Sequence, residues 1–387
     1  MEIKELKEKF IQEFGDNKSK INIFFAPGRV NLIGEHTDYN GGFVFPCTIS
    51  YGTYCLLRKN NKDKIRFSSL NTEFITEVIL SEIKPVRNVW VNYPLGVIAQ
   101  FINKGCHLNS GCDLLFFGNV PNGAGLSSSA SLEMATAIAI NDVYNFNLNI
   151  IDLAKMSQKA EHDYAGVNCG IMDQFTSGMG KQDNAIFLNC DTLEYKLVPV
   201  SLKDAKIIIA NTNSPHKLDS GKYNERVAEC KAAVEAIKPY KNISLLAEIS
   251  YDEFRGIEDK LSDKIIKKRA RHVISEIERT KNAVKALKSN NLAEFGKLMN
   301  ESHDSLRDDY EVTGMHLDTM VEEARKINGV IGSRMTGGGF GGSTVSIVKN
   351  NAIEEFINKV GNNYKVKTGI KPEFYIAEII DGAKKIE

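Results

Sequence analysis

Four charged or titratable side chains lie within ten positions of one short segment, GRVNLIGEHTDYNGG, which runs from Gly28 to Gly42. They are Arg29, Glu35, His36 and Asp38, and apolar residues and glycines surround them. Side chains of this kind at such a density usually face water. Here they alternate with residues typical of a hydrophobic core, which marks the segment as a candidate site.

A second candidate is the segment PNGAGLSSSAS, residues 121–131, where an expected strand leads into a glycine loop and then a helix. The start of a helix offers unpaired N–H groups and the positive end of a dipole, and glycines let the backbone approach an anion closely. The simplest interpretation is a tight turn capped by serine. Three consecutive hydroxyls, Ser127, Ser128 and Ser129, favour a phosphate-binding loop instead. It is not a Walker A loop, because no Gly-Lys-Ser/Thr follows.

A third glycine-rich segment, TGGGFGGST from Thr336 to Thr344, matches G-x-G-x-x-G at positions 337, 339 and 342. A dinucleotide-binding loop should open a helix, yet STVSIV follows and is typical of a strand. We therefore expect a backbone wall that packs near the phosphate-binding loop and faces phosphate or sugar.

Two acids stand near these segments. Glu161 lies in an expected helix, and Asp173 lies between Gly170 and Gly178. Taken alone, Glu161 is explained as an exposed glutamate of a helix, and Asp173 is explained as a capping aspartate.

The elements that would position these side chains mix strands and helices without strict alternation, which favours an α+β fold. We expect a strand, a loop and two further strand runs over residues 21–59, and a strand at 112–120. A second series of elements begins with a strand at 206–213. The expected helices cover 1–15, 90–105, the region after 127, 151–164, 223–238, 265–287 and 291–306. A domain boundary near 190–205 divides the 387 residues into domains of 1–195 and 196–387.

Composition excludes several classes of protein. A formal net charge of +0 argues against nucleic acid as the main partner, and the basic segment from Lys264 to His272 is expected to be a solvated helix face. Seven dispersed cysteines form no C-x-x-C or zinc pattern and suggest reduced thiols in the cytoplasm. The N-terminal segment is amphipathic, and no apolar run is long enough for a membrane span.

The three motifs, in this order, resemble those of the GHMP kinases, which include galactokinase, homoserine kinase, mevalonate kinase and phosphomevalonate kinase. The first motif is similar to the galactokinase signature, and VPNGAGLSSSASLE and MTGGGFGGS resemble the second and third motifs of that family. CGIMDQF and GKYNERVAEC also fit, so the resemblance covers nearly the whole chain. It implies a two-domain α+β fold with the active site in the cleft between the domains.

The resemblance also implies roles for individual residues. Asp173 would be the catalytic base and Arg29 its partner. Galactose would be held by Glu35, His36, Thr37, Asp38, Gly170 and Tyr223. The nucleotide would contact Ser69, Trp90, Gly123, Ala124, Gly125, Leu126, Ser127, Ser128 and Ser129. Mg²⁺ would be held by Ser129 and Glu161.

The implied reaction transfers the γ-phosphoryl group of ATP to the C1 hydroxyl of galactose, the first committed step of galactose catabolism. A carboxylate can accept hydrogen bonds from two adjacent hydroxyls, which explains the acids of the first motif. Three alternatives stay open: a kinase for N-acetylgalactosamine or another hexose, a sugar- and ATP-binding regulator without turnover, and a dinucleotide oxidoreductase. A monomer is expected, with galactose and ATP as its ligands.

Overall fold

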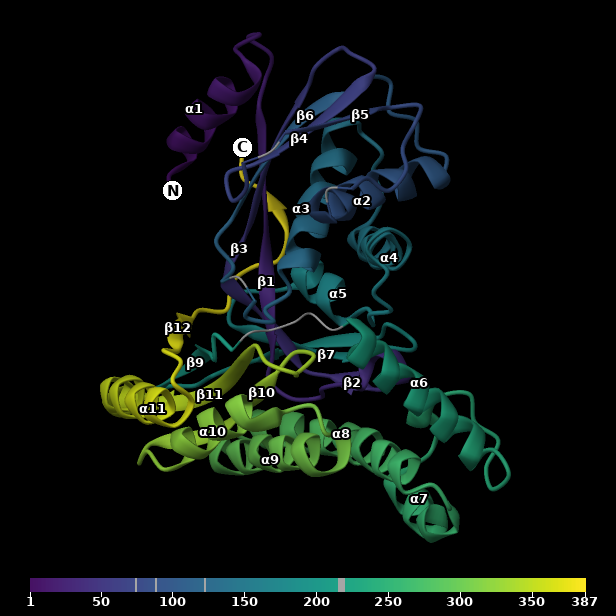
Figure 1. Cartoon of the computed structure of the whole chain (residues 1–387), viewed down its shortest axis with the longest axis vertical. Coiled ribbons are helices and arrows are strands. Elements are labelled where there is room, and N and C mark those ends of the chain that lie inside the picture. The colour runs from purple at the N-terminus through teal and green to yellow at the C-terminus, as the bar shows by residue number, and fades with distance from the viewer. Residues whose placement is uncertain (74, 88, 122, 215–219) are drawn as a thin grey trace.

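The computed structural model describes residues 1–387 except 74, 88, 122 and 215–219. Figure 1 shows an upper part built mainly from the first half of the chain and a lower part rich in later helices. Helices and strands are mixed in both parts, as the α+β prediction requires.

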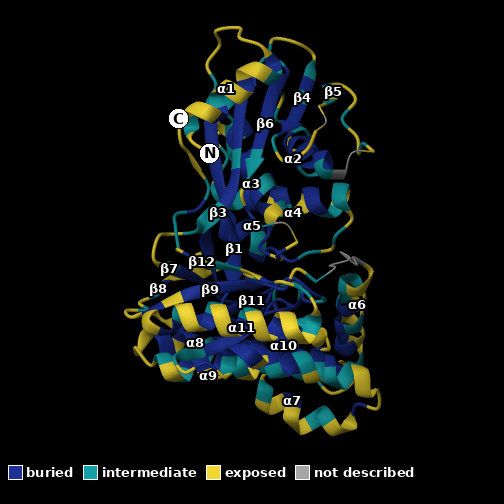
Figure 2. Cartoon of the chain, turned by 60° about the vertical axis from the view of Figure 1, so that its left-hand side comes forward, coloured by how far each residue is buried: buried dark blue, intermediate teal, exposed yellow. Residues whose placement is uncertain are grey.

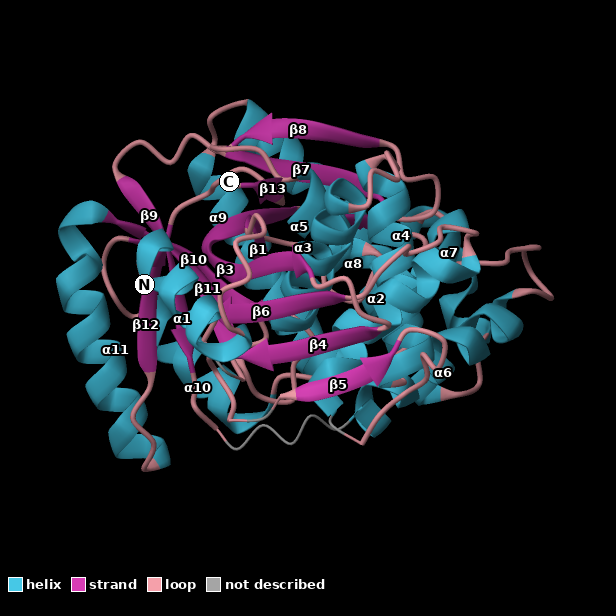
Figure 3. Ribbon diagram, turned by 90° about the horizontal axis from the view of Figure 1, so that it is seen from above, coloured by secondary structure: helices cyan, strands magenta, loops and turns pink. Residues whose placement is uncertain are grey.

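The upper part is built on a six-stranded sheet with the order β13-β1-β3-β6-β4-β5, seen from above in Figure 3. Alternate residues of these strands point to opposite faces. Leu56 and Leu115 pack beneath α1, whereas Leu57 and Leu114 join the core under helices α2 to α5. The strands are β1 (Asn22–Asn31), β3 (Pro46–Lys59), β4 (Lys64–Ser69), β5 (Thr76–Ile79), β6 (Cys112–Gly118) and β13 (Lys384–Lys385). The helices are α1 (Ile3–Phe14), α2 (Asn92–Asn103), α3 (Ser128–Val143), α4 (Ile150–Ala160) and α5 (Met172–Met179).

The lower part contains a four-stranded sheet with the order β10-β11-β9-β12. Ile208 and Ala210 of its β9 strand face a core shared with α10 and α11, while Ile207 and Ile209 face a core shared with α8 and α9. The strands are β9 (Ala205–Asn211), β10 (Val330–Thr336), β11 (Ser343–Lys349) and β12 (Glu373–Ala377). The helices are α6 (Ser220–Ile237), α7 (Tyr251–Ile257), α8 (Lys264–Lys288), α9 (Leu292–Ser305), α10 (Gly314–Arg325) and α11 (Ile353–Thr368).

The two parts are joined by buried structure. Val30 and Leu32 of the first motif share one hydrophobic core with β9, β11, α8 and α9, and Figure 2 shows this central region as buried. A three-stranded sheet lies beside it and consists of β2 (Phe43–Val44), β7 (Asn184–Asn189) and β8 (Tyr195–Pro199). Because β13 pairs with β1, the end of the chain returns to the upper sheet. The boundary between residues 195 and 196 stays a prediction.

The expected elements are present, with one instructive difference. The sequence predicts separate strand runs at 43–49 and 52–59, but β3 is continuous from Pro46 to Lys59. A Cβ atom at Gly52 would lie 2.3 Å from the Ala26 carbonyl oxygen. The glycine therefore permits close strand contact rather than ending a strand.

The basic segment at the start of α8 also differs from expectation. Arg269 is buried and pairs with Glu229 and Glu311, and Arg271 pairs with Glu258 and Asp309. These arginines hold helices together instead of forming a simple solvated face. Within the described part of the chain, no helix is both long and apolar enough to span a membrane.

Candidate active site

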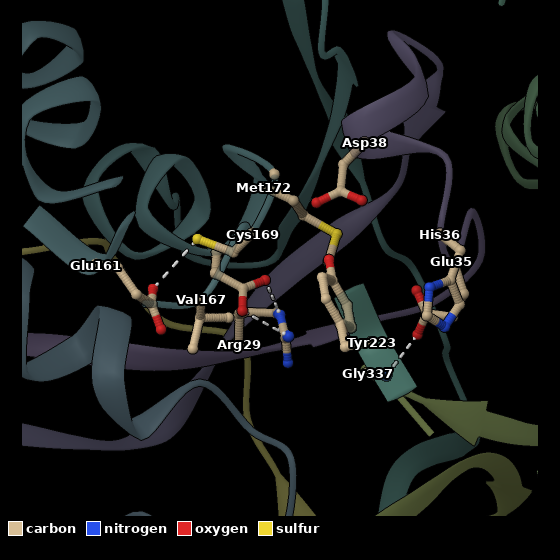
Figure 4. Close-up of a pocket in the computed structure, with 13 residues that line it drawn as sticks. Arg29, Glu35, His36, Asp38, Glu161, Val167, Cys169, Met172, Tyr223 and Gly337 are labelled. Carbon is tan, nitrogen blue, oxygen red and sulfur yellow. Dashed lines mark hydrogen bonds and ion pairs between the residues drawn. The ribbon is translucent and has the colours of Figure 1, made fainter. Parts of the chain in front are cut away.

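A cavity of about 580 Å³, counting space open to solvent, lies where the first motif meets α5, α6 and the third motif. Figure 4 places Glu161 on one side and Glu35 and His36 on the other, with Arg29 and Tyr223 between them. The lining residues are Arg29, Glu35, His36, Asp38, Glu161, Val167, Cys169, Gly170, Met172, Asp173, Tyr223, Gly337 and Gly338. Residues far apart in the sequence, including most of those predicted for catalysis and sugar binding, thus share one cavity.

Glu35 is held almost completely by the protein. Its Oε1 accepts hydrogen bonds from the Gly337 amide at 2.7 Å and from Arg334 Nη1 at 3.3 Å, and its Oε2 accepts from Asn31 Nδ2. A carboxylate has about four acceptor positions. One position on Oε2 is therefore left for a ligand hydroxyl.

A buried polar network supports Glu35 from the lower part of the molecule. Arg334 of β10 also donates to the Asn31 carbonyl and to Ser302 Oγ. Ser302 Oγ donates to Glu276 Oε1 at 2.5 Å, and the same oxygen accepts the Gly34 amide at 3.0 Å. The first motif is thereby fixed from α8, α9 and β10 at once.

His36 has a left-handed backbone conformation with φ 61°, which turns its ring toward an aromatic cluster. Its Nδ1 lies 2.8 Å from the Tyr39 hydroxyl, which lies 2.7 Å from the Tyr310 hydroxyl. Burial, followed by the nearby His272 and arginines, lowers the pKa of His36 to about 3. The ring is therefore neutral at physiological pH and can hydrogen-bond a ligand without carrying charge.

Asp38 lies directly against Gly170. A Cβ atom at position 170 would sit 2.0 Å from Asp38 Oδ2, so any larger residue would displace the carboxyl group. Burial and the charge of Asp173 raise the pKa of Asp38 to about 7. Asp38 makes no ion pair within the part of the chain that the structure describes.

Arg29 and Asp173 form a bidentate ion pair at the centre of the cavity. Arg29 Nε and Nη2 donate to the two Asp173 oxygens at 2.7 and 2.8 Å, and Arg29 Nη1 donates to the Gly125 carbonyl at 2.8 Å. Burial alone would lower the pKa of Arg29, but Asp173, Glu35 and Asp38 together raise it. Ser127 Oγ adds a donor to Asp173 at 2.5 Å. The carboxylate is thus fixed between the first motif and the phosphate-binding loop.

The loop of the second motif leaves the start of α3 open. Ser127 adopts φ 59° and makes no capping hydrogen bond to the helix, because its side chain is bonded to Asp173. Gly123 and Gly125 also have positive φ, which glycine tolerates without strain. The free N–H groups at the start of the helix fit an anion. Of the predicted loop, Asn122 lies outside the described residues.

The third motif packs against this loop, which confirms the predicted wall. A Cβ atom at Gly337 would lie 2.9 Å from the Gly125 carbonyl oxygen, and one at Gly342 would lie 3.6 Å from the Ala124 oxygen. Gly337 therefore allows the two backbone segments to approach closely, whereas a Cβ atom at Gly342 would make only an ordinary van der Waals contact.

Glu161 begins a π-helical turn, Glu161–Ala165, that follows α4. Such turns often occur at functional sites because they re-aim one side chain. Ser129 hydrogen-bonds Glu161, the Cys169 thiol donates to its Oε2 at 3.4 Å, and Gln174 Nε2 donates to the same oxygen at 2.7 Å. Burial and Asp173 raise the pKa of Glu161 to about 7. The described residues contain no cluster of three or more His, Cys, Asp or Glu suited to a metal ion.

Ten predicted site residues are not among those that line the cavity: the seven of the loop from Gly123 to Ser129, and Thr37, Ser69 and Trp90. The Thr37 hydroxyl bonds to the carbonyls of Gly34 and Phe43, inside the loop of the first motif. Ser69 and Trp90 instead meet at Phe116 on the sheet: Ser69 is its partner in register, and the Trp90 ring lies 6.0 Å from the Phe116 ring. Their assignment to the adenine side stays a prediction.

Sequence reasoning also missed several residues that support the site. Their shared feature is burial behind a lining residue, and they are Glu133, Gln174, His272, Glu276, Ser302 and Arg334. Weak signals existed for two of them. Gln174 follows Asp173 directly, and Glu133 is an acid among the small and apolar residues of the first half of its helix.

Three family models match successive parts of the chain. Residues 8–59 match a galactokinase galactose-binding signature. Residues 92–181 match the GHMP kinase N-terminal domain, and residues 283–366 match the GHMP kinase C-terminal domain.

Relatives match over nearly the full length. Galactokinase of Clostridium acetobutylicum is 52% identical over 368 residues, covering 94% of this chain and 95% of the relative. Galactokinase of Fusobacterium nucleatum is 51% identical over 387 residues, covering 98% and 100%. The crystal structure of Lactococcus lactis galactokinase complexed with galactose superposes with TM-score 0.97 at 44% identity, covering 99% and 100%. A mevalonate kinase at 20% identity and TM-score 0.65, covering 94% and 100%, shares the fold alone.

Proposed function

The chain belongs to the galactokinase family of GHMP kinases, and on that premise we propose how its cleft transfers the γ-phosphoryl group of ATP to the C1 hydroxyl of galactose. The products are galactose 1-phosphate and ADP. The observation that carries the proposal is the position of the Arg29–Asp173 pair. In Figure 4, Arg29 lies between Glu161 on one side and Glu35 and His36 on the other, and its partner Asp173 accepts a hydrogen bond from Ser127 at the start of α3.

Glu35, His36 and Asp38 bind galactose hydroxyls, with Gly170 and Tyr223 completing the surface around the sugar. Glu35 has one free acceptor position, and Asp38 forms no ion pair with any residue that the structure describes. Fixed acceptors of this kind discriminate strongly, because a misplaced hydroxyl leaves a buried polar group unpaired. Galactose and glucose differ in the orientation of one hydroxyl, so the arrangement supports selection between them.

Asp173 accepts the proton of the C1 hydroxyl. Arg29 orients this carboxylate through two hydrogen bonds. The same guanidinium stabilises negative charge on the transferring group, where positioning and electrostatics dominate catalysis. Ser127 fixes the second Asp173 oxygen relative to the loop that binds the phosphates.

The nucleotide phosphates bind at the start of α3, from Gly123 to Ser129. The donors that Ser129 and Glu161 present are hard oxygens, which fit Mg²⁺ when phosphate oxygens and water complete its coordination. When bound, Mg²⁺ neutralises charge on the phosphates. The two protein groups hold the cation next to the loop.

The decisive test is ADP release with Mg·ATP against galactose, glucose, N-acetylgalactosamine, 2-deoxygalactose and mevalonate. Strong turnover with galactose and little with glucose is the expected result. Comparable turnover with N-acetylgalactosamine would assign a broader substrate. A rise in melting temperature with galactose but no turnover on any sugar would assign a regulator and contradict the kinase.

Location and assembly are also proposals. All seven cysteines are free thiols, which supports a reducing compartment such as the cytoplasm. Monomeric assembly is the second proposal. Sedimentation of the purified protein with galactose and ADP tests the second proposal.

A further inference from the structure

A second acid lies behind Glu161 and has no part in the mechanism above. Glu133 of α3 is fully buried, and its Oε2 accepts a hydrogen bond from Gln174 Nε2 at 2.9 Å. The same nitrogen donates to Glu161 Oε2 at 2.7 Å. Gln174 itself is fully buried on α5, and Figure 1 shows α3, α4 and α5 side by side. One amide group therefore connects two carboxyl groups from two other helices.

The two acids lack protein counter-charges. No Lys, Arg or His forms an ion pair with Glu133 or Glu161 among the residues that the structure describes. Two carboxyl groups in a buried environment repel each other unless donors or a cation separate them. The amide of Gln174 supplies two N–H groups in a fixed plane, one for each carboxyl.

We propose that Gln174 is a positioning residue that holds Glu161 in the orientation needed to bind the cation accompanying ATP, with Glu133 as its buried anchor. The inference rests on the proposed function and deepens it. Because Gln174 is adjacent to Asp173 on α5, one helix sets the positions of both the catalytic base and the cation-binding acid.

The residue type matters for this role. Glutamate at position 174 would add a third acid and lose the donors, and methionine would keep the size but lose both hydrogen bonds. Asparagine keeps the amide but is one methylene shorter. Residues that orient a metal ligand typically change metal affinity by about 10–100-fold when they are replaced.

The experiment measures Mn²⁺ binding in the presence of ADP by electron paramagnetic resonance of free Mn²⁺. Gln174→Met is expected to raise the Mn²⁺ dissociation constant on the order of 10–100-fold, while the galactose dissociation constant stays within twofold. Excess Mn²⁺ or Mg²⁺ should restore much of the lost kcat. Gln174→Asn should behave similarly and serves if the methionine variant does not fold.

The matched control is Gln100→Met. Gln100 is buried on α2 and donates to the Asp163 carboxylate at 3.0 Å, outside the cavity lining. This variant should bind Mn²⁺ like the unaltered protein.

Unchanged Mn²⁺ affinity in folded Gln174→Met or Gln174→Asn would overturn the inference, as would equal losses of Mn²⁺ and galactose binding. A chain that binds Mn²⁺ with ADP but never phosphorylates galactose would contradict the proposed function instead. In that case the Mn²⁺ comparison still decides the role of Gln174.

Discussion

The carboxyl groups on the two sides of the cavity differ in whether the protein supplies them with a positive counter-charge. On the sugar side, Glu35 is bonded to the buried Arg334, and at the centre Asp173 is bonded to Arg29. On the cation side, Glu161 and Glu133 share one neutral amide and form no ion pair within the described residues. The protein thus supplies positive charge where an uncharged ligand binds.

The difference follows from the ligands. A sugar brings no charge, so Glu35 takes its counter-charge from the protein through Arg334, whereas Asp38 forms no ion pair among the described residues. A nucleotide brings its own divalent cation, so an internal arginine beside Glu161 would compete with it. Replacing a charged residue should therefore affect catalysis and ligand binding differently on the sugar side and on the cation side.

The pair at the centre gives the largest expected effect. Asp173→Asn removes the base and should lower kcat by about 10²–10⁴. Galactose affinity, measured by calorimetry without nucleotide, should change little because Glu35 and Asp38 remain. Near-normal turnover in a folded variant would contradict the assignment of Asp173 as the catalytic base.

On the sugar side, Arg334→Met leaves the buried Glu35 without its cation. Breaking a buried pair in this way typically costs about 3–5 kcal/mol of unfolding free energy. The KM for galactose should also rise, with less effect on the KM for ATP. Urea unfolding and initial-rate kinetics measure the two changes.

The control for this variant is Arg58→Met. Arg58 is as buried and pairs with Asp113 at 3.0 Å on the upper sheet, outside the cavity lining. It should lose stability, though less than Arg334→Met because Asp113 keeps Arg66 at 2.8 Å, and the KM for galactose should not change. Equal rises of KM in both variants would mean that Arg334 acts only through stability.

A smaller effect is expected from Gly170→Ala. The new Cβ must displace the Asp38 carboxyl group, which would otherwise lie 2.0 Å away. Losing one hydrogen bond from a charged acceptor costs about 1.5–3 kcal/mol, or roughly 10–100-fold in galactose affinity. Gly256→Ala is the control, because no atom lies within 4 Å of its Cβ. Unchanged galactose binding in Gly170→Ala would remove Asp38 from the sugar site.

The sequence predicted the charged side chains that face the ligand far better than those that support them. Arg29, Glu35, His36 and Asp38 stand in one segment, so their types and spacing were visible. Arg334 and Glu276 act on that segment from 299 and 242 positions away. Pairing over such distances depends on how β10 and α8 pack, and local pattern carries no information on that.

For the fold as well, local sequence patterns were informative and long-range contacts were not. Hydrophobic runs and caps predicted where helices and strands form, while Gly52 was misjudged because its role is a close contact with β1. The resemblance places Thr37 at the sugar, and this stays a prediction. The turn directs its hydroxyl to the carbonyls of Gly34 and Phe43.

The pH dependence of galactose binding tests Asp38, a sugar-side acid that forms no ion pair among the residues described by the structure. Burial and Asp173 raise the pKa of Asp38 to about 7, so it gains a proton as the pH falls through 7. If galactose binds the ionised form, its dissociation constant rises roughly tenfold for each pH unit well below that value. His36, with a pKa of about 3, stays neutral across this range. Calorimetry without nucleotide at pH 6 to 8 should show the rise, and Asp38→Asn should abolish it. A flat profile in the unaltered protein would contradict this titration.

The smallest expected effect concerns the nucleotide side. Trp90 is the only tryptophan of the chain, and its ring packs edge-on against Phe116 beside Ser69. If this region contacts adenine, ATP should change the tryptophan emission and galactose should not. An aromatic contact contributes about 0.5–1.5 kcal/mol, so Trp90→Leu should weaken ATP binding only several-fold.

ATP binding is also measured in Ser69→Ala. The Ser69 hydroxyl accepts a hydrogen bond from the Asn71 amide at 3.2 Å, and the variant removes this hydroxyl beside Trp90. Weaker ATP binding in both variants, with galactose binding unchanged, would extend the nucleotide site from the start of α3 to this part of the sheet. Tryptophan emission that responds to galactose but not to ATP would place Trp90 under the influence of the sugar side. Trp90 would then be assigned to the sugar side of the cavity and not to the nucleotide side.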